Sequence, residues 1–337
     1  MVQTLPSWHT AAQQRRLMRT RIRDFFVYIP KPEARAALIS IGVGIAMFGV
    51  KSLAYLRTGS TAILSDALEG IVNVIAAGFA AYSLATAHRP ADEDHPYGHG
   101  KVEFLSAGFE GGMIVLAALI MLGEGANRIH HIHSHGANIE AIGYGVLLLS
   151  VAMAVHAVLG LYLVRLGKRQ SSMTLEADGW HLLTDAATSG MAMISLLVVK
   201  WTGWAYADPV GAIAIAVYIS LTGMGLLRRA AAGLMDEQDR TDGKMLREIL
   251  DAHVNGSGPR ICSYHKLRHR HSGRYHWVDF HMLVPAWWDI QRGHQIASSI
   301  EYEIEQALGE GNATAHVEPC GDENCKACEA ARQPPMK

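Results

Sequence analysis

The sequence has no strong excess of charge of either sign. Lysine and arginine together number 30, and aspartate and glutamate together number 31, which leaves a formal net charge of −1 with histidine neutral. Proteins that bind nucleic acid use an excess of basic side chains to neutralise phosphates. The charge balance therefore gives no indication of nucleic acid as a partner.

Cysteine is scarce and unevenly placed. The chain of 337 residues has 4 cysteines, of which Cys320, Cys325 and Cys328 crowd the C-terminus and Cys262 stands apart. This favours thiols or metal ligands in a reducing compartment over a disulfide scaffold. The spacing of the last three suits a soft metal, with Cys262 or His316 available as a fourth ligand, and an ordinary reduced tail is the alternative.

The N-terminus lacks the pattern of a secretory signal peptide. Residues 1–35 are polar and basic, with five arginines between residues 15 and 23, and they precede the first apolar run. A signal peptide instead places a short apolar stretch directly after a brief basic region. We expect a cytoplasmic segment beside the membrane that fixes the topology, with a membrane-surface helix as the alternative.

Long apolar runs are what the sequence has in quantity. Hydrophobic residues make up 50% of the chain, and the mean hydropathy of +0.11 fits a membrane domain joined to a soluble domain. Six runs are each long enough, at about 1.5 Å per residue, to cross a hydrocarbon core of about 30 Å. They are Ala36–Leu56, Thr61–Ala87, Glu103–Ile129, Ile139–Leu166, Leu175–Trp201 and Pro209–Ala232.

The distribution of basic residues gives these runs a direction. Lysine and arginine gather before the first run, between the second and third, between the fourth and fifth, and at the end of the sixth. The opposite loops carry only Arg57, Arg128 and Lys200. Because cytoplasmic loops are enriched in Lys and Arg, we expect both termini in the cytoplasm. The compact loops favour a bacterial inner membrane as the location.

The character of the sequence changes at about Met235, where a polar linker begins. Beyond it the alternation and spacing of apolar residues predict a small α+β domain. Its expected elements are a helix at Lys244–Val254, strands at Arg260–Arg270 and Tyr275–Val284, a helix at Ile290–Leu308 and a short strand at Thr314–Val317. We therefore expect an N-terminal segment, a six-helix transmembrane domain, a cytoplasmic α+β domain and a Cys-rich tail, with bounds 1–35, 36–232, 233–319 and 320–337.

Two pairs of potential metal ligands lie inside the predicted spans. Glu69 and Asn73 are in the second run, and His181 and Asp185 are in the fifth. Residues four apart in a helix point from one face, one turn apart. An ionisable group in hydrocarbon costs at least about 2.5–3.5 kcal/mol, so these side chains should face protein or water and serve a function there. Facing each other, the pairs form a four-ligand site for a divalent transition metal; the alternative is that they only hold the helices together.

Three segments resemble motifs of a known family. Residues 65–73, Ser-Asp-Ala-Leu-Glu-Gly-Ile-Val-Asn, resemble the second-helix motif of the cation diffusion facilitators, a family of proton-coupled divalent-metal exporters. Residues 177–185 resemble the fifth-helix motif, and residues 95–103 resemble the loop signature that enters the third helix. The resemblance covers residues 36–320. It implies a homodimer with six transmembrane helices and a cytoplasmic ferredoxin-like α+β domain that also binds metal.

The resemblance also implies which residues hold metal. Glu69 and Asn73 depart from the family pattern, which usually has Asp or His at the first position and Asp at the second. One imidazole with three oxygen donors is a harder site than a His-rich zinc site, and it tolerates Mn, Fe, Co or Ni as well as Zn. The implied ligands are Glu69, Asn73, His181 and Asp185 in the membrane, Asp92, His95 and His99 in the loop between the second and third helices, and His265, His281, His294, His316 and Glu318 in the cytoplasmic domain.

Histidine, with 18 residues, is also abundant outside these positions. A plain polar loop around a Gly98 turn is the alternative to a metal site at Asp92. The run His130–His135 is expected in a loop after the third span, where it gathers or releases metal or is simply solvated. We interpret His269, His271 and His276 as surface residues.

These observations predict a transporter rather than an enzyme. We expect export of a divalent cation, Zn²⁺ first and Fe²⁺, Mn²⁺, Co²⁺ or Ni²⁺ as alternatives, by proton antiport, with membrane lipid and a second copy of the chain as partners. His181 is the natural coupling group, because imidazole titrates near physiological pH and binds metal only when neutral. A membrane-bound metal sensor or scaffold without transport is the alternative. A His-box metalloenzyme is disfavoured because the intramembrane ligands are mostly oxygen.

Overall fold

The computed structural model describes residues 30–58, 61–135, 143–204, 206–255, 261–323, 325 and 328–329. The chain divides into two compact units, Met1–Ala230 and Ala231–Lys337. The basic segment predicted at the N-terminus lies outside the described residues up to residue 29, as does the start of the predicted fourth run, at residues 139–142.

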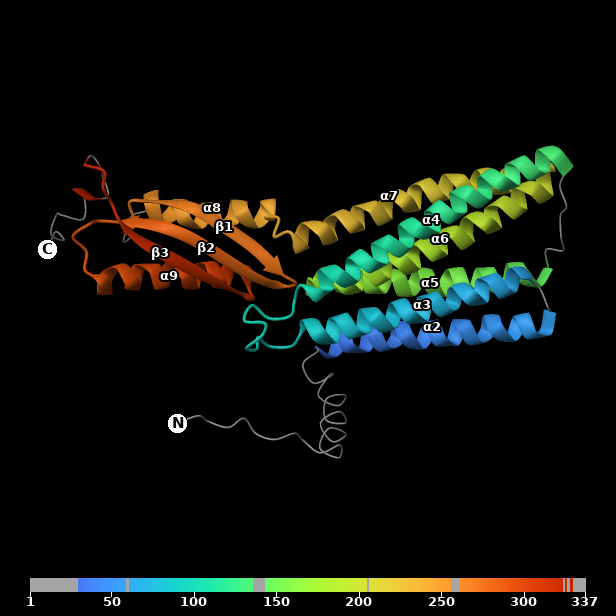
Figure 1. Ribbon diagram of the computed structural model, residues 1–337, viewed down its shortest axis with the longest axis horizontal. Helices are drawn as coiled ribbons and strands as arrows, with labels where there is room; N and C mark the ends of the chain where they lie inside the picture. Colours follow the sequence, from blue (N-terminus) through green and yellow to red (C-terminus); the bar gives the residue numbers. More distant parts are fainter. Residues whose placement is uncertain are drawn as a thin grey trace, which may run out of the picture. The chain divides into compact units, whose positions relative to one another are not determined.

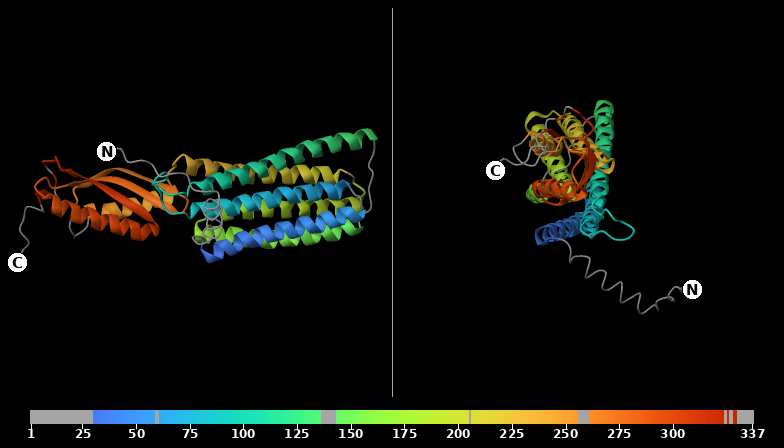
Figure 2. Two further views of the ribbon diagram at one scale, coloured as in Figure 1. Left: turned by 60° about the horizontal axis from the view of Figure 1, so that its bottom comes forward. Right: turned by 90° about the vertical axis from the view of Figure 1, so that its left-hand side faces the viewer.

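The first unit is built from long helices that run side by side (Figures 1 and 2). Six helices in the described ranges are long and apolar enough to cross a membrane, which confirms the six predicted spans. Large apolar side chains face outward from them, such as Val158 at 72% exposed and Leu221 at 70%, as expected of surfaces that contact lipid. The helices are α2 (Lys31–Thr58), α3 (Thr61–Ala87), α4 (Val102–His135), α5 (Gly143–Gln170), α6 (Met173–Thr202) and α7 (Ala207–Leu234).

The ends of α6 follow directly from the local sequence. Ser172 has extended backbone angles and its hydroxyl accepts the N–H of Leu175, so it caps the first turn. At the other end Gly203 has φ 72° and donates its N–H to the carbonyl of Val199, which closes the helix. Helix α6 therefore agrees with the predicted fifth span, and His181 and Asp185 lie in its first half.

Two glycines allow α5 and α6 to approach closely. A Cβ atom at Gly160 would lie 2.8 Å from the carbonyl oxygen of Gly179, and one at Gly179 would lie 2.7 Å from the backbone nitrogen of Val164. Only glycine fits at such a contact, as at many packed transmembrane helices. The close approach brings a face of α5 next to the turns of α6 that carry the predicted ligands.

The predicted loop placement of the histidine run is wrong. The described backbone of α4 stays helical through His135. The cause is local, because the sequence offers no proline or glycine between Arg128 and Gly136 that would end the helix. Among the histidines of this run, the structure describes the side chain of His130, which is exposed.

The second unit is a three-stranded sheet with two helices. The elements are α8 (Arg240–Asn255), β1 (Ser263–Ser272), β2 (Tyr275–Val284), α9 (Ile290–Leu308) and β3 (Gly311–Pro319). β1 and β2 form an antiparallel hairpin closed at Gly273, φ 64°, and β3 returns through α9 to pair in parallel with β2. This is the predicted α-β-β-α-β order, and β3 is longer than predicted because its pairing with β2 runs from Gly311 to Pro319.

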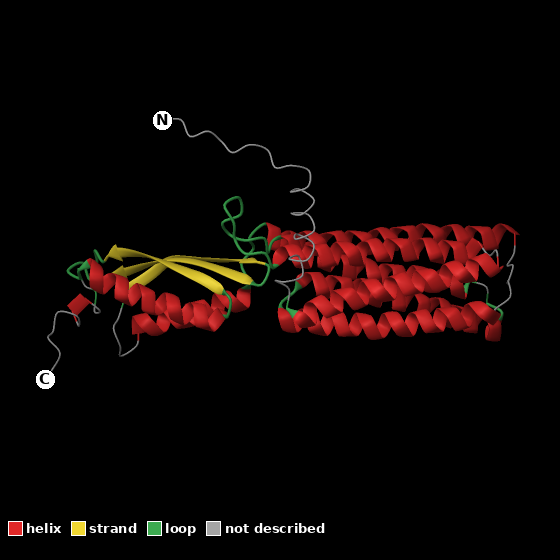
Figure 3. Cartoon of the chain, turned by 90° about the horizontal axis from the view of Figure 1, so that it is seen from below, coloured by secondary structure: helices red, strands yellow, loops and turns green. Residues whose placement is uncertain are grey.

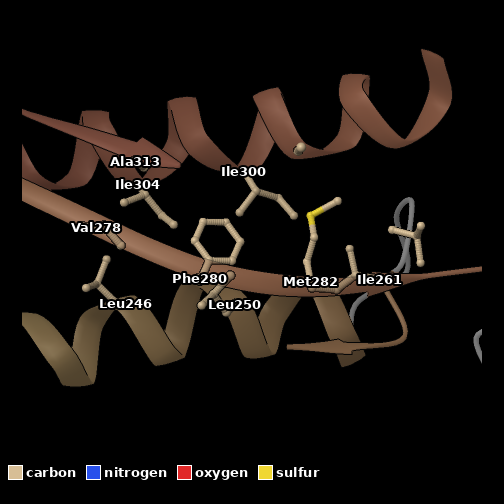
Figure 4. Close-up of a cluster of buried hydrophobic side chains, with 11 residues drawn as sticks. Leu246, Leu250, Ile261, Val278, Phe280, Met282, Ile300, Ile304 and Ala313 are labelled. Carbon is tan, nitrogen blue, oxygen red and sulfur yellow. The ribbon is translucent and has the colours of Figure 1, made fainter. Parts of the chain in front are cut away.

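Both helices cover one face of this sheet (Figure 3). Phe280 and Met282 of β2 are buried at 1% and 0% exposed, and they contact apolar side chains of the two helices in one cluster (Figure 4). Leu246 and Leu250 come from α8, and Ile300 and Ile304 come from α9. Because side chains alternate along a strand, the residues between those core positions, His281 among them, point to the opposite, uncovered face.

Candidate metal sites

Three of the four predicted transmembrane ligands meet between α3 and α6. Nδ2 of Asn73 donates to Oδ2 of Asp185 over 2.8 Å. Nε2 of His181 lies 3.2 Å from Oδ1 of the same amide, so the ring N–H donates to it. Asn73 and His181 are buried, at 9% and 7% exposed. The amide of Asn73 therefore bridges the imidazole and the carboxylate in the middle of a membrane-spanning bundle.

Glu69 lies one helical turn before Asn73 in α3. Its side chain is outside the described part of the structure. The backbone places it on the same helix face as Asn73, as its spacing predicts.

Two further ionisable side chains, which the sequence analysis did not single out, lie against this group. Oε2 of Glu110, on α4, is 3.8 Å from Nδ1 of His181, and Glu110 is fully buried. Nδ1 of His156, on α5, is 4.0 Å from Oδ2 of Asp185. Neither has a second carboxylate, imidazole or amide four residues away, so the one available signal was its presence inside a span.

A small cavity adjoins these residues. It has a volume of about 10 Å³ and is lined by Asn73, His156 and His181, together with Lys51 and Asp178. Asp178 accepts a hydrogen bond of 2.8 Å from the hydroxyl of Ser40. The volume is roughly that of one water-sized probe, so the site offers space for a single small ion beside its polar atoms.

The loop between α3 and α4 brings its three predicted ligands together. Oδ1 of Asp92 lies 3.0 Å from Nδ1 of His95, and Oδ2 lies 3.4 Å from Nε2 of His99. The chain turns at Gly98, φ 77°, whose N–H donates to the carbonyl of His95. Desolvation raises the pKa of Asp92, but hydrogen bonds from His95 and the charges of both histidines outweigh it and hold that pKa below its usual value. The ligand atoms lie within 4.8 Å of one another.

The cytoplasmic unit carries a row of histidines across its sheet. His265 of β1 pairs with His281 of β2, and His281 pairs with His316 of β3. The ring centroids of neighbours are 5.1 Å and 4.7 Å apart. The register of the three strands thus aligns side chains that are far apart in the sequence, on the face opposite the helices.

Glu318 completes this row. Its carboxylate lies 2.7 Å from Nδ1 of His281, 3.2 Å from Nε2 of His265 and 3.7 Å from Nε2 of His316. The hydrogen bond with His281 and the charges of the three imidazoles hold the pKa of Glu318 below its usual value. His265, His281 and Glu318 can present one ligand atom each within 4.8 Å. His294, on α9, is exposed and outside that group, although it lines a cavity of about 360 Å³ with Glu318.

A second group of potential ligands on the same sheet lies at the end where the hairpin turns. Oδ2 of Asp242, in the first turn of α8, is 3.4 Å from Nε2 of His271 and 3.3 Å from Nδ1 of His276. Burial and the neighbouring imidazole of His271 lower the pKa of His276. The expectation that these two histidines are surface residues is wrong, because both are partly buried. The pairing of His271 with His276 could have been predicted from the position of the hairpin turn. The contribution of Asp242 could not, because it depends on how α8 packs against the sheet.

Family models match almost the whole of both units. A model of the cation efflux transmembrane domain matches residues 37–235. A model of the cation efflux protein cytoplasmic domain matches residues 244–320. The first match ends just after α7, at residue 235, and the second begins within α8, at residue 244.

Relatives of known sequence agree with these matches. The uncharacterized transporter sll1263 of Synechocystis is 36% identical over 286 residues, which is 85% of this chain and 90% of that one. The cation-efflux pump FieF of Shewanella oneidensis is 26% identical over 88% of this chain and 95% of its own. A solved structure of the putative zinc transporter CzrB is 26% identical, covers 25% of this chain and 99% of its own, and has a TM-score of 0.23. The chain is therefore a multi-pass membrane transporter of divalent metals, not an enzyme, and it belongs to the cation efflux family, the cation diffusion facilitators.

Proposed function

We propose that the chain exports a divalent transition metal from the cytoplasm in exchange for protons, through a site shared by α3 and α6. The observation that carries this proposal is the amide of Asn73, 2.8 Å from Asp185 and 3.2 Å from His181 inside the membrane. Glu69, one turn earlier, supplies the fourth ligand. Four side chains from two helices then surround one ion, and small relative movements of the helices open the site to either side.

The donor set favours Zn²⁺ as first cargo and leaves other metals open. One imidazole and three oxygens suit zinc, and they also suit Fe²⁺, Mn²⁺, Co²⁺ and Ni²⁺, because the site has no thiolate to select a soft metal. The amide oxygen of Asn73 is neutral, so the site carries less negative charge than one with a third carboxylate. This lowers its affinity for every divalent metal and eases release.

Proton exchange follows from the contacts of His181. In this proposal His181 is an imidazolium before metal arrives, and its Nε2–H donates to Asn73. Metal binding at Nε2 releases that proton and leaves a neutral ring that is protonated at Nδ1, because only a deprotonated ring nitrogen can ligate. Nδ1 faces Glu110 at 3.8 Å. A carboxylate on the second ring nitrogen is the usual partner of a ligating histidine, where it fixes the tautomer and raises basicity. We therefore assign Glu110 the role of positioning His181 and stabilising the proton that stays on Nδ1.

Replacing Glu110 with glutamine tests that role. Outer-shell carboxylates are commonly worth about 10–100-fold in metal affinity, so we expect the apparent KM for the metal to rise by about that factor while some transport remains. The dependence of flux on pH should also shift, because the amide cannot hold a proton. Metal uptake into vesicles at several pH values measures both. Glu124→Gln, the same change on an exposed part of α4, is the control. An unaltered pH profile in Glu110→Gln would limit Glu110 to packing.

The sites outside the membrane have supporting roles in this proposal. The Asp92, His95 and His99 group shapes the loop that enters α4. The row of His265, His281, His316 and Glu318 binds regulatory metal and holds two cytoplasmic domains together in a homodimer when metal is abundant, with His294 as a further ligand. We infer from the basic loops that both termini lie in the cytoplasm, and we propose a bacterial inner membrane, with lipid around the six helices, as the location.

Replacing Glu318 with glutamine should weaken cytoplasmic metal binding by about 10–100-fold and leave transport largely intact. The carboxylate contacts all three imidazoles, and its pKa is held below its usual value. Binding should weaken in acid, because protons compete with the metal for the ligand nitrogens. Equilibrium Zn²⁺ binding to the full chain in an Asp185→Asn background, compared with and without Glu318→Gln, assigns the lost binding to this site. Asp279→Asn, an exposed carboxylate on the same strand face, is the control.

Vesicle transport of Zn²⁺, Fe²⁺, Mn²⁺, Co²⁺ and Ni²⁺ under a pH gradient tests the proposed function as a whole. We expect flux of Zn²⁺ with one or more of the others. Metal binding by the full chain without flux of any of them would support a sensor or scaffold instead.

A further inference from the structure

The four cysteines of the chain gather at one place in the second unit. Their Sγ atoms all lie within 4.8 Å of one another. None of them is in a disulfide. We call this group the cysteine cluster; it consists of Cys262, Cys320, Cys325 and Cys328.

The sheet brings the first two cysteines together. Cys262 stands just before β1, and its N–H donates to the carbonyl of Leu283 over 2.7 Å. Cys320 stands just after β3, and its N–H donates to the carbonyl of Val284 over 2.8 Å. β1 is antiparallel to β2 and β3 is parallel to it, so the start of one and the end of the other meet at the same end of β2.

The chain then turns back to supply the other two. The N–H of Cys325 donates to the carbonyl of Asp322, and the N–H of Glu329 donates to the carbonyl of Cys325. The N–H of Cys328 points to Sγ of Cys325. A backbone N–H directed at a sulfur offsets the negative charge of a ligating thiolate. Cys325 and Cys328 are each 8% exposed, although they lie close to the end of the chain.

The spacing of the sulfur atoms fits one tetrahedral ion. Zn–S bonds of about 2.3 Å place tetrahedral sulfurs about 3.8 Å apart. The Sγ atoms of Cys262 and Cys328 lie 3.4 Å apart, and the remaining pairs are within 4.8 Å. A closed set of four thiolates without an open position is the pattern of a structural zinc site.

We propose that the cysteine cluster is a tetrathiolate site for a thiophilic divalent cation, Zn²⁺ in the cell. It differs in chemistry from the transport and histidine sites, which present imidazole and oxygen, and it selects zinc or cadmium strongly over manganese or magnesium. The ion fastens the residues after β3 to the end of the sheet at which β1 begins. The site does not depend on transport, and the chain can fill it whatever its cargo is.

Cobalt spectroscopy on the full chain tests the site. The detergent-purified protein, reduced and stripped of metal, is titrated with Co²⁺ under anaerobic conditions. A tetrathiolate site produces strong sulfur-to-cobalt charge-transfer bands in the near ultraviolet, whereas sites of imidazole and oxygen produce none. We expect these bands to saturate at one Co²⁺ per chain and to disappear when Zn²⁺ is added, because Zn²⁺ binds thiolates more tightly.

Variants locate the bands in the cysteine cluster. Cys262→Ser and Cys328→Ser should each weaken the binding that produces the bands by roughly 100-fold or more, since even outer-shell changes cost 10–100-fold. Ser263→Ala, at the exposed neighbour of Cys262, should leave them unchanged. Cys328 lies beyond the sheet, so its serine variant keeps the fold even if Cys262→Ser does not. Bands that persist in Asp185→Asn separate this site from the transport site.

Two results would overturn the proposal. One is Co²⁺ binding by the folded wild type without charge-transfer bands. The other is a disulfide within the cysteine cluster in protein whose thiols are alkylated at the moment of cell lysis, since an oxidised pair cannot ligate.

Discussion

Metal flux through Asp185→Asn is expected to fall by roughly 100-fold or more, beyond the 10–100-fold that outer-shell changes cost a metal site. Asparagine keeps the size of the side chain and can still accept the 2.8 Å hydrogen bond from Asn73, so the bundle should fold. What it removes is a negative charge. With Asn73 already neutral, Asp185 and Glu69 are the two carboxylates of the proposed four-ligand set, and the loss of one leaves a site too weak to collect a divalent ion.

Uptake into vesicles, measured for each of the five metals with wild type, Asp185→Asn and Asp279→Asn, checks this expectation. Asp279→Asn makes the same chemical change at an exposed position of the central strand β2, in the second unit, and should transport normally. Zn²⁺ flux in Asp185→Asn within a few-fold of wild type would mean that the ion crosses elsewhere. A metal-dependent result, with one cargo lost and another kept, would instead show that the other three ligands suffice for the second metal.

The helices and the paired ligands were predictable because they depend on local pattern. The six apolar runs predicted the six membrane-spanning helices, and the spacing of four residues predicted that His181 and Asp185 share one helix face. Strand alternation predicted β2, and apolar residues at helical spacing predicted α9, each with the bounds that the structure has. The end of α4 differs from the prediction, which places His130–His135 in a loop, although none of these residues breaks a helix.

Residues whose role depends on packing between elements were not predictable in the same way. Glu110 and His156 are single polar residues in apolar runs, and the sequence does not say which helix each one faces. Cys262 reaches Cys320 because β1 and β3 flank the same strand in opposite directions, a fact of register rather than of spacing. The spacing of Cys320, Cys325 and Cys328 indicates a metal site with three thiols, but the sequence does not show whether Cys262 or His316 is the fourth ligand.

Dissipating the pH gradient should abolish uphill metal accumulation entirely. If metal exchanges for n protons, and the membrane potential is clamped at zero, the metal ratio across the membrane equals the proton ratio raised to the power n. A gradient of one pH unit is worth about 1.4 kcal/mol per proton, which sustains about a tenfold metal gradient for each proton exchanged.

Vesicles with an acidic interior, exposed to external Zn²⁺, allow both sides of this exchange to be followed. Internal zinc should rise to a plateau whose logarithm is linear in the pH difference, and the slope is the proton stoichiometry. An internal pH dye should report alkalinisation as zinc enters, because protons leave. A slope of one would fit His181 as the sole exchanging group, whereas a slope of two would require a second, for which Glu110 at 3.8 Å is placed. Zinc uptake that neither moves the dye nor responds to a proton ionophore would exclude antiport, and His181 would then be a ligand without a part in coupling.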